Sequence, residues 1–249
     1  MSFSIYRQFA RDLVTTGELD PLYTMLYRAR AEKGDEWVKL FCMYMLMFYD
    51  SKGAYEEATT GEVGFWERIR QDFDTRRRGK ERRHFRGENG RVSFISLQAL
   101  GSPVAAFDII AHTRTIPTAN TVLNSAGVMG FGEYFRLKWV DYQAKVMLVP
   151  FNYSHLPFML PESPMKCIKQ VWPDTHPTVA MENIVGWIDD LPDPFSGTTM
   201  CGNSEAETIA CAIPSYLIKG NYKMGDDIAK YHAELKDYPE LVRLLPAKV

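Results

Sequence analysis

The sequence has few cysteines and histidines, and their spacing argues against several kinds of site. Its four cysteines, at positions 42, 167, 201 and 211, contain no CxxC pair, and its five histidines are scattered over 249 residues. We therefore assign no metal ligands. No secretory leader is evident, so we expect reduced thiols in a cytoplasm rather than a disulfide framework.

Long hydrophobic runs and a nucleotide-binding loop are also missing. The most apolar stretch, residues 37–49, is too short to span a bilayer and contains Lys39. Gly79-Lys80 is followed by Glu81 and lacks the earlier glycine of a Walker A loop, which disfavours an ATP-driven kinase. We therefore expect no membrane partner and no cofactor.

Apolar residues recur at helical spacing through most of the chain, and no run favours a β-strand. We predict a mainly α fold, with one helical transferase domain over residues 1–249 and an irregular, proline-rich connection at about 147–177. Expected helices cover residues 5–50 with interruptions, 53–70, 92–100, 103–111, 119–127 and 179–190. Further helices begin at Asn203 and at Asp226 or Asp227, either of which would cap the last one.

The strongest local feature is a basic run in an otherwise acidic chain. Residues 76–91 hold eight Lys/Arg and two acids, a local net charge of +6, so the other residues sum to −8 to give −2. Seven of the eight cations are arginine, whose planar fork matches phosphate oxygens two at a time. The run indicates a polyphosphate or nucleic-acid ligand, and the alternative is a solvated basic loop.

A second informative stretch is the glycine turn at 127–132, between an expected helix and the apolar segment 134–139. Helix, glycine turn and helix are typical of a helix-hairpin-helix, an element of DNA glycosylase-like folds whose turn aims backbone N–H groups at a DNA phosphate. Gly130 and Gly132 would contact the backbone, with Lys138 and Asp141 following. The alternative is a plain hairpin between two core helices.

Glu207 and Cys211 lie four residues apart in an expected helix and would therefore share a face. A carboxylate in such a site can act as a general base, and a thiol can act as a nucleophile. The structural alternatives are a small core thiol for Cys211, a cap or ion-pair partner for Glu207, and simple solvent exposure for Asp141.

The order of several motifs resembles the bacteriophage α-glutamyl/putrescinyl-thymine pyrophosphorylases, also called amino acid:DNA transferases. The residues that carry this resemblance are Asp20-Pro21-x-Tyr23, Phe48-Tyr49 with Gly53, Gly79-Lys80-Glu81-Arg82-Arg83-x-Phe85-Arg86-Gly87, Gly130-x-Gly132 with Lys138 and Asp141, Glu207-x-x-x-Cys211, and Lys219-Gly220-x-Tyr222-x-x-Gly225-x-Asp227. The match runs over most of the chain and is weakest at residues 145–200.

The resemblance implies a phage enzyme that acts in the host-cell cytoplasm on DNA carrying phosphorylated or pyrophosphorylated 5-hydroxymethyluracil. Such enzymes displace that group with the amine of a free amino acid, possibly glycine, or of a polyamine. Lys80, Arg82, Arg83, Arg86 and Lys219 would bind the leaving group or DNA phosphates, and Glu207 or Asp141 would accept the proton of the amine. Phe85 or Tyr222 would stack on a flipped base, Asp227 would contact substrate, and Cys211 would add to pyrimidine C6.

Two other functions fit the same residues. A glycosylase-like enzyme would use Asp141 after the hairpin and release free base. A non-catalytic module would bind plain DNA through the arginine run, with strong salt dependence and no change to the bases.

The arginine run gives the first testable prediction. If it cradles the leaving group, Arg83→Ala loses turnover much more than affinity for unmodified DNA. Parallel measurement of turnover and of plain-DNA binding checks this. An equal loss of both would return the run to simple backbone binding.

Overall fold

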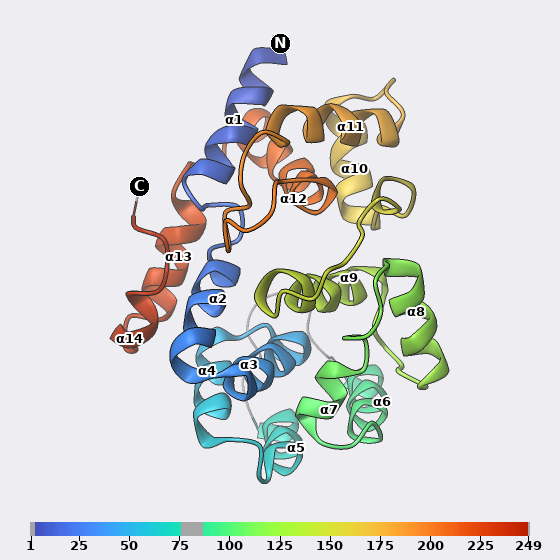
Figure 1. Ribbon diagram of the computed structural model, residues 1–249, viewed down its shortest axis with the longest axis vertical. Coiled ribbons are helices and arrows are strands. Elements are labelled where there is room, and N and C mark those ends of the chain that lie inside the picture. Colours follow the sequence, from blue (N-terminus) through green and yellow to red (C-terminus); the bar gives the residue numbers. More distant parts are fainter. Residues whose placement is uncertain (1–2, 76–86, 249) are drawn as a thin grey trace. The chain divides into compact units, whose positions relative to one another are not determined.

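A computed structural model describes residues 3–75 and 87–248 (Figure 1). Over these residues the protein is mainly α-helical, as the sequence predicts, and its β pairing is a single isolated bridge between Pro192 and Met200. The α-helices of the described residues are α1 (Phe3–Thr15), α2 (Pro21–Lys33), α3 (Asp35–Phe48), α4 (Ser51–Thr60), α5 (Phe65–Thr75), α6 (Gly87–Gln98), α7 (Pro103–Asp108), α8 (Ile116–Ser125), α9 (Glu133–Asp141), α10 (Glu162–Val171), α11 (Pro177–Ile188), α12 (Asn203–Ile213), α13 (Asp226–Glu234) and α14 (Pro239–Val242). Two π-helices, η1 (Tyr142–Val146) and η3 (Pro214–Ile218), continue α9 and α12, and η2 (Leu156–Phe158) is a 3-10 turn.

Several helices begin where a capping side chain is followed by proline. Ser102 accepts a hydrogen bond from the Ala105 amide ahead of α7, and Thr115 forms a capping box with Thr118 ahead of α8. The His176 ring accepts a hydrogen bond from the Thr178 amide at the start of α11. Because proline has no N–H to satisfy in the first turn, these starts follow from local sequence.

The described chain groups into two compact units. Unit 1 combines residues 1–28 with 152–249, and unit 2 comprises residues 29–151. The first boundary falls within α2, and the second falls just before the loop that leads to η2. Whether the units act as one domain, as the sequence analysis expects, stays a prediction.

In unit 1, α12 is the central helix and packs against α1, α10 and α11 (Figure 1). Its buried face alternates small and branched residues, since Ala206, Ile209, Ala210 and Ile213 are at most 1% exposed. Alanines let neighbouring helices approach closely, while the isoleucines fill the space between them. The packing therefore fixes which α12 side chains face α10.

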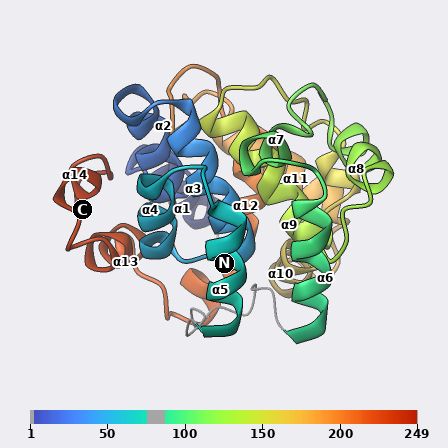
Figure 2. The same cartoon turned by 90° about the horizontal axis from the view of Figure 1, so that it is seen from below.

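In unit 2, α3 packs against α4, α7 and α9, and Figure 2 shows α3 and α4 side by side. Eleven of its 14 residues are buried, as its apolar sequence predicts. Gly53 of α4 is required at the contact, because a Cβ there would collide with the Tyr44 hydroxyl and ring. None of the described helices combines the length and apolarity needed to span a membrane.

The single helix predicted for residues 53–70 is wrong, because the chain turns between α4 and α5. Gly61 and Gly64 adopt positive φ angles of 91° and 74°, which an L side chain rarely tolerates. Arg68 closes the turn: its guanidinium donates to Glu57 Oε2 at 2.6 Å and to the Gly61 carbonyl at 2.6 Å. The turn sets the direction of α5, the helix that precedes the arginine run.

The connection predicted as irregular at about 147–177 contains a helix, with irregular segments before and after it. Residues 162–171 form α10, although they contain Pro164. Proline is compatible there because it lies in the first helical turn, where N–H groups have no intrahelical partner. An ion pair of 2.5 Å between Lys166 and Glu162 adds to the helix. This helix carries a cysteine that becomes part of the candidate site.

A single carboxylate organises the loop between α11 and α12. Asp193 is 8% exposed. Its oxygens accept hydrogen bonds from the Phe195 amide at 3.0 Å, the Ser196 amide at 2.8 Å and the Thr199 amide at 3.1 Å. Burial alone would raise the pKa of Asp193, but these hydrogen bonds outweigh it and lower the pKa below its ordinary value.

We expect Asp193→Asn to lower the free energy of unfolding by about 1–3 kcal/mol at neutral pH, because an amide cannot accept at both positions. The difference from wild type is fully present above the ordinary aspartate pKa of about 4 and shrinks as pH falls through the lower folded-state value. Denaturant unfolding across pH measures it, with the exposed Asp174→Asn as control. Equal stability at neutral pH would contradict this role.

Candidate functional site

The predicted pairing of Glu207 and Cys211 is present on α12. The Cys211 thiol lies 4.0 Å from Glu207 Oε1, one helical turn away, and Glu207 is 3% exposed. The helix is anchored at its start by Glu205, whose carboxylate accepts from the Gly202 amide at 2.9 Å. Capping at this end is therefore done by Glu205 and not by Glu207.

A second cysteine, which the sequence analysis did not select, joins this pair. Cys167 of α10 places its sulfur 3.8 Å from the Cys211 carbonyl oxygen and is partly exposed. The two residues are 44 positions apart, so no spacing rule could connect them. Lys219, the residue after η3, adds its positive charge to the same group. We call Cys167, Cys211, Glu207 and Lys219 the thiol cluster.

The two thiols of this cluster differ in acidity. A hydrogen bond from Cys211 lowers the pKa of Cys167 to about 7, helped by Lys219 and opposed by burial and Glu207. The same hydrogen bond, together with burial, raises the pKa of Cys211. The two shifts together favour ionisation of Cys167 over ionisation of Cys211.

Tyr222 and Asp227 also lie in unit 1, around a buried carboxylate. Glu18 is 0% exposed. It accepts the Tyr222 hydroxyl at 2.8 Å, the Asp227 amide at 2.6 Å and the Ile228 amide at 3.3 Å. Glu18 thus accepts the hydrogen bonds of the amides at the N-terminus of α13. The sequence analysis expected Asp226 or Asp227 to cap this helix. The N-cap residue is Gly225, with φ of 95°.

The group around Glu18 changes the chemistry of its neighbours. Burial, then the charges of Glu18 and Asp20, raise the pKa of Asp227 to about 6. Burial and the hydrogen bond to Glu18 also raise the pKa of Tyr222, so its hydroxyl stays protonated. The Tyr222 ring meets Phe9 edge-on at 6.2 Å. Stacking of Tyr222 on a nucleobase stays a prediction.

Asp141 ends α9 in unit 2, and it is 2% exposed, which excludes simple solvent exposure. Lys138 Nζ lies 3.8 Å from Asp141 Oδ2, one turn earlier. The helix continues without a break into the π-helix η1, a kind of irregularity that often marks functional sites. Lys138 and Asp141 therefore form a buried charge pair, as their spacing allows.

The glycine turn before α9 joins two packed helices, α8 and α9. Gly130 has φ of 76°, and Gly132 is the N-cap of α9, with open space where a Cβ would lie. Arg136 holds the turn by donating to the Phe131 carbonyl at 2.8 Å and to Asn124 at 2.7 Å. Contact of this turn with a DNA phosphate, as in a helix-hairpin-helix, stays a prediction.

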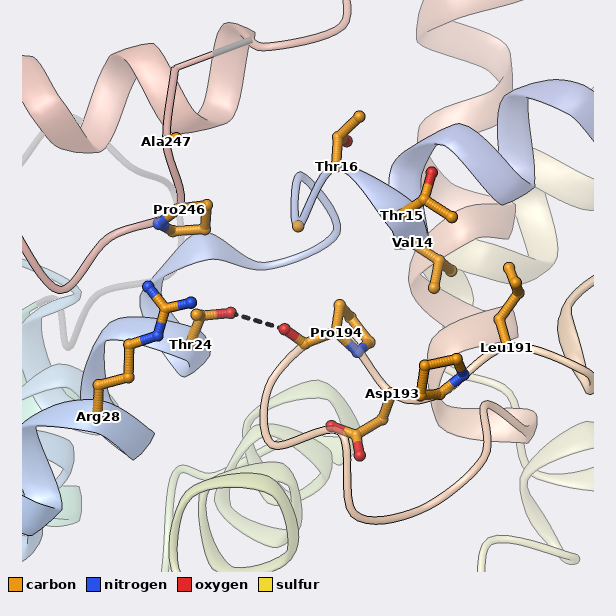
Figure 3. Close-up of a pocket in the computed structure, with 12 residues that line it drawn as sticks. Val14, Thr15, Thr16, Thr24, Arg28, Leu191, Asp193, Pro194, Pro246 and Ala247 are labelled. Carbon is orange, nitrogen blue, oxygen red and sulfur yellow. Dashed lines mark hydrogen bonds between the residues drawn. The ribbon is translucent and has the colours of Figure 1, made fainter.

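The predicted phosphate-binding residues Lys80, Arg82, Arg83 and Arg86, with Phe85, lie outside the described residues. A cavity of about 450 Å³ is present in unit 1, bordered by Thr16, Thr24 and Arg28. Figure 3 shows Thr24 bonded to the Pro194 carbonyl and the Asp193 carboxylate turned into its own loop. None of the sequence-predicted site residues lines this cavity. Within the described residues, no three His, Cys, Asp or Glu side chains are grouped to hold a metal ion.

The sequence matches a known protein family over most of its length. A family model described as amino acid:DNA transferase matches residues 14–221. The chain belongs to the amino acid:DNA transferase family. A Delftia phage PhiW-14 protein named putrescinyltransferase is 24% identical over 257 residues, which cover 97% of this chain and 81% of that protein.

Membership confirms the resemblance based on ordered motifs and the expected transferase class. In this amino acid:DNA transferase, the matched range includes the thiol cluster and the Lys138–Asp141 pair. Tyr222 and Asp227 lie just beyond it, although Glu18, their common partner, lies inside.

The raised pKa of Asp227 predicts opposite effects on stability and activity. Because the fold opposes ionisation of Asp227, Asp227→Asn should be more stable than wild type by roughly 1–3 kcal/mol above pH 6. The gain should shrink toward an unfolded-state pKa of about 4, where wild-type Asp227 is protonated.

Denaturant unfolding and DNA-modification assays on the same samples check this, with the exposed Asp189→Asn as control. A variant that gains stability and loses transfer marks a functional carboxylate. Retained transfer would show that Asp227 has no part in the reaction.

Proposed function

We propose that this protein joins an amine to the 5-methylene carbon of 5-hydroxymethyluracil in DNA, after the hydroxyl has been phosphorylated or pyrophosphorylated. The observation that carries the proposal is the family match together with a relative, named putrescinyltransferase, that covers 97% of the chain. The donor is a polyamine such as putrescine, or a free amino acid. Since that relative is a phage protein, we place the reaction in the host-cell cytoplasm.

The reaction exchanges one bond for another. The C–O bond of the 5-methylene breaks, phosphate or pyrophosphate leaves with the electron pair, and a C–N bond forms. The ammonium nitrogen loses one proton before it attacks and a second one after the C–N bond has formed. Lys80, Arg82, Arg83 and Arg86 would stabilise the negative charge on the leaving group. Gly130 and Gly132 would contact the DNA backbone.

Asp227 is the base that we favour for the amine. Its carboxylate is partly buried and lies near the charges of Glu18 and Asp20, so a bound ammonium group would relieve the cost of its ionisation. A base with a pKa of about 6 is deprotonated at neutral pH yet takes up a proton more readily than an ordinary aspartate. Glu207 faces the thiol cluster instead, and Asp141 is paired with Lys138.

One assay separates this function from a glycosylase and from a plain DNA-binding protein. DNA carrying pyrophosphorylated 5-hydroxymethyluracil is incubated with the protein and a mixture of glycine and putrescine, then digested, and the nucleosides are weighed. We expect a nucleoside whose mass has gained one amine and lost pyrophosphate.

DNA with unphosphorylated 5-hydroxymethyluracil is the control and should stay unchanged, because hydroxide is a poor leaving group. Release of free base would support the glycosylase instead. Unmodified nucleosides with every amine and both leaving groups would rule out the proposed transfer.

A further inference from the structure

A second groove of unit 1 combines apolar side chains with a few polar ones. It has a volume of about 620 Å³ and is formed by the turn η2, helix α10 and the loop between α10 and α11. This volume lies within the range of about 300–1,000 Å³ that is typical of ligand pockets. Its lining includes apolar Phe158, Leu160 and Met165 and polar Lys169, Asp174 and His176.

Phe158 is 75% exposed, although the backbone that carries it is held in place. Its amide donates to the His155 carbonyl at 3.1 Å, and the next amide donates to the Leu156 carbonyl at 3.0 Å. Leu156 and Leu160, on either side, are only 1% and 4% exposed. Among the described residues, no other aromatic ring contacts that of Phe158. The turn therefore presents an aromatic face to solvent from a fixed position.

The polar side chains of the groove offer two donors and one acceptor. The Thr178 amide donates to His176 Nδ1 at 3.3 Å, so the neutral ring carries its proton on Nε2 and donates from there. Lys169 is a donor and Asp174 an acceptor. Neither of these two side chains has a hydrogen-bond or ion-pair partner within residues 3–75 and 87–248. Their bonding capacity is therefore available to a ligand.

A uracil-type base is complementary to this set of groups. The edge that pairs in a duplex presents a carbonyl oxygen, the N3–H and a second carbonyl oxygen, which require donor, acceptor and donor from a partner. Cytosine differs, because it presents an amino donor and two acceptors. The flat ring of either base can stack on an aromatic side chain, since every base has a π-face. The edge is accessible only when the base is unpaired.

We propose that this groove binds an unpaired uracil- or thymine-type base of the DNA substrate. Phe158 stacks on the ring of the base, and Asp174 accepts a hydrogen bond from its N3–H. His176 and Lys169 donate to its two carbonyl oxygens. The proposal deepens the function proposed above and rests on it, because that function supplies DNA as the ligand. The bound base is either the one that reacts or one beside it, and both present the same edge.

The first test measures binding alone, with single-stranded oligo(dT) and oligo(dC) as probes. Wild type should bind oligo(dT) more tightly. Phe158→Ala should weaken binding of both probes by about 10-fold, because stacking does not depend on the base edge. The matched variant is Met159→Ala, which changes an apolar residue that is 42% exposed on the same turn and does not line the groove. It should bind both probes as wild type does.

The second test concerns recognition of the edge. Asp174→Ala should bind oligo(dT) and oligo(dC) equally, because it removes the acceptor for N3–H. Loss of a negative charge also strengthens binding to any DNA. The control is therefore Asp189→Ala, which removes an exposed acid outside the groove and should keep the preference for oligo(dT). In addition, an oligonucleotide carrying 5-iodouracil should photocrosslink to the peptide that contains Phe158.

Transfer kinetics of Phe158→Ala then identify which base occupies the groove. On DNA carrying pyrophosphorylated 5-hydroxymethyluracil, kcat at saturating DNA should fall if the groove holds the reacting base. If it holds a neighbouring base, the KM for DNA should rise while kcat stays at the wild-type value.

The outcomes separate the two proposals. Unchanged binding of oligo(dT) by Phe158→Ala, or equal binding of the two probes by wild type, would refute the base-binding groove even if the protein transfers an amine. If both binding results are as expected but wild type transfers no amine, the groove stands as a nucleobase site and the proposed function is wrong.

Discussion

Unit 1 depends on a carboxylate that is completely buried. Glu18 lies between α1 and α2, near the start of the chain, and its three hydrogen-bond donors come from residues 222–228, near the end. A buried carboxylate is stabilised only when its oxygens are bonded, and hydrogen bonds to a charged group contribute about 1.5–3 kcal/mol each. Because unit 1 is assembled from two distant segments, Glu18 both joins them and sets the electrostatics around α13.

The joining of these segments has a chemical consequence. The charge that satisfies the α13 amides also acts on Asp227, whose carboxylate becomes harder to ionise. A carboxylate whose ionisation is disfavoured by neighbouring negative charges accepts a proton more readily. It also attracts cations, and an amine donor is a cation at neutral pH. Glu18 thus stabilises the start of α13 through its hydrogen bonds and raises the pKa of Asp227 through its charge.

Much of the helical framework was accessible from the sequence, whereas the breaks depended on particular glycines and prolines. Apolar spacing located α3, and the prediction over 53–70 failed because Gly61 and Gly64 adopt left-handed conformations that periodicity does not reveal. Pro164 suggested irregular structure, although a first-turn proline suits a helix. A rule based on position within the turn, rather than on proline content, would have found α10.

The candidate site was predictable only where its parts are close in sequence. The Glu207–Cys211 pair followed from the helical repeat and is present. Cys167 and Glu18 were missed because their partners are 44 and about 200 residues away, and a single sequence carries no signal for such pairs. Their effect on neighbouring pKa values arises only once α10 packs on α12 and residues 222–228 reach Glu18.

Two groups of unit 1, Cys167 and Asp227, have pKa values that are shifted in opposite directions. A hydrogen bond with Cys211 and the charge of Lys219 lower the pKa of Cys167, which favours its thiolate. Burial and like charges raise the pKa of Asp227, which suits the base that we propose it to be. The first adjustment stabilises the charged form of its group, whereas the second opposes it and lowers stability at neutral pH. A fold selected for stability alone would have no reason to keep the raised pKa of Asp227. This shift therefore supports a functional role for that carboxylate.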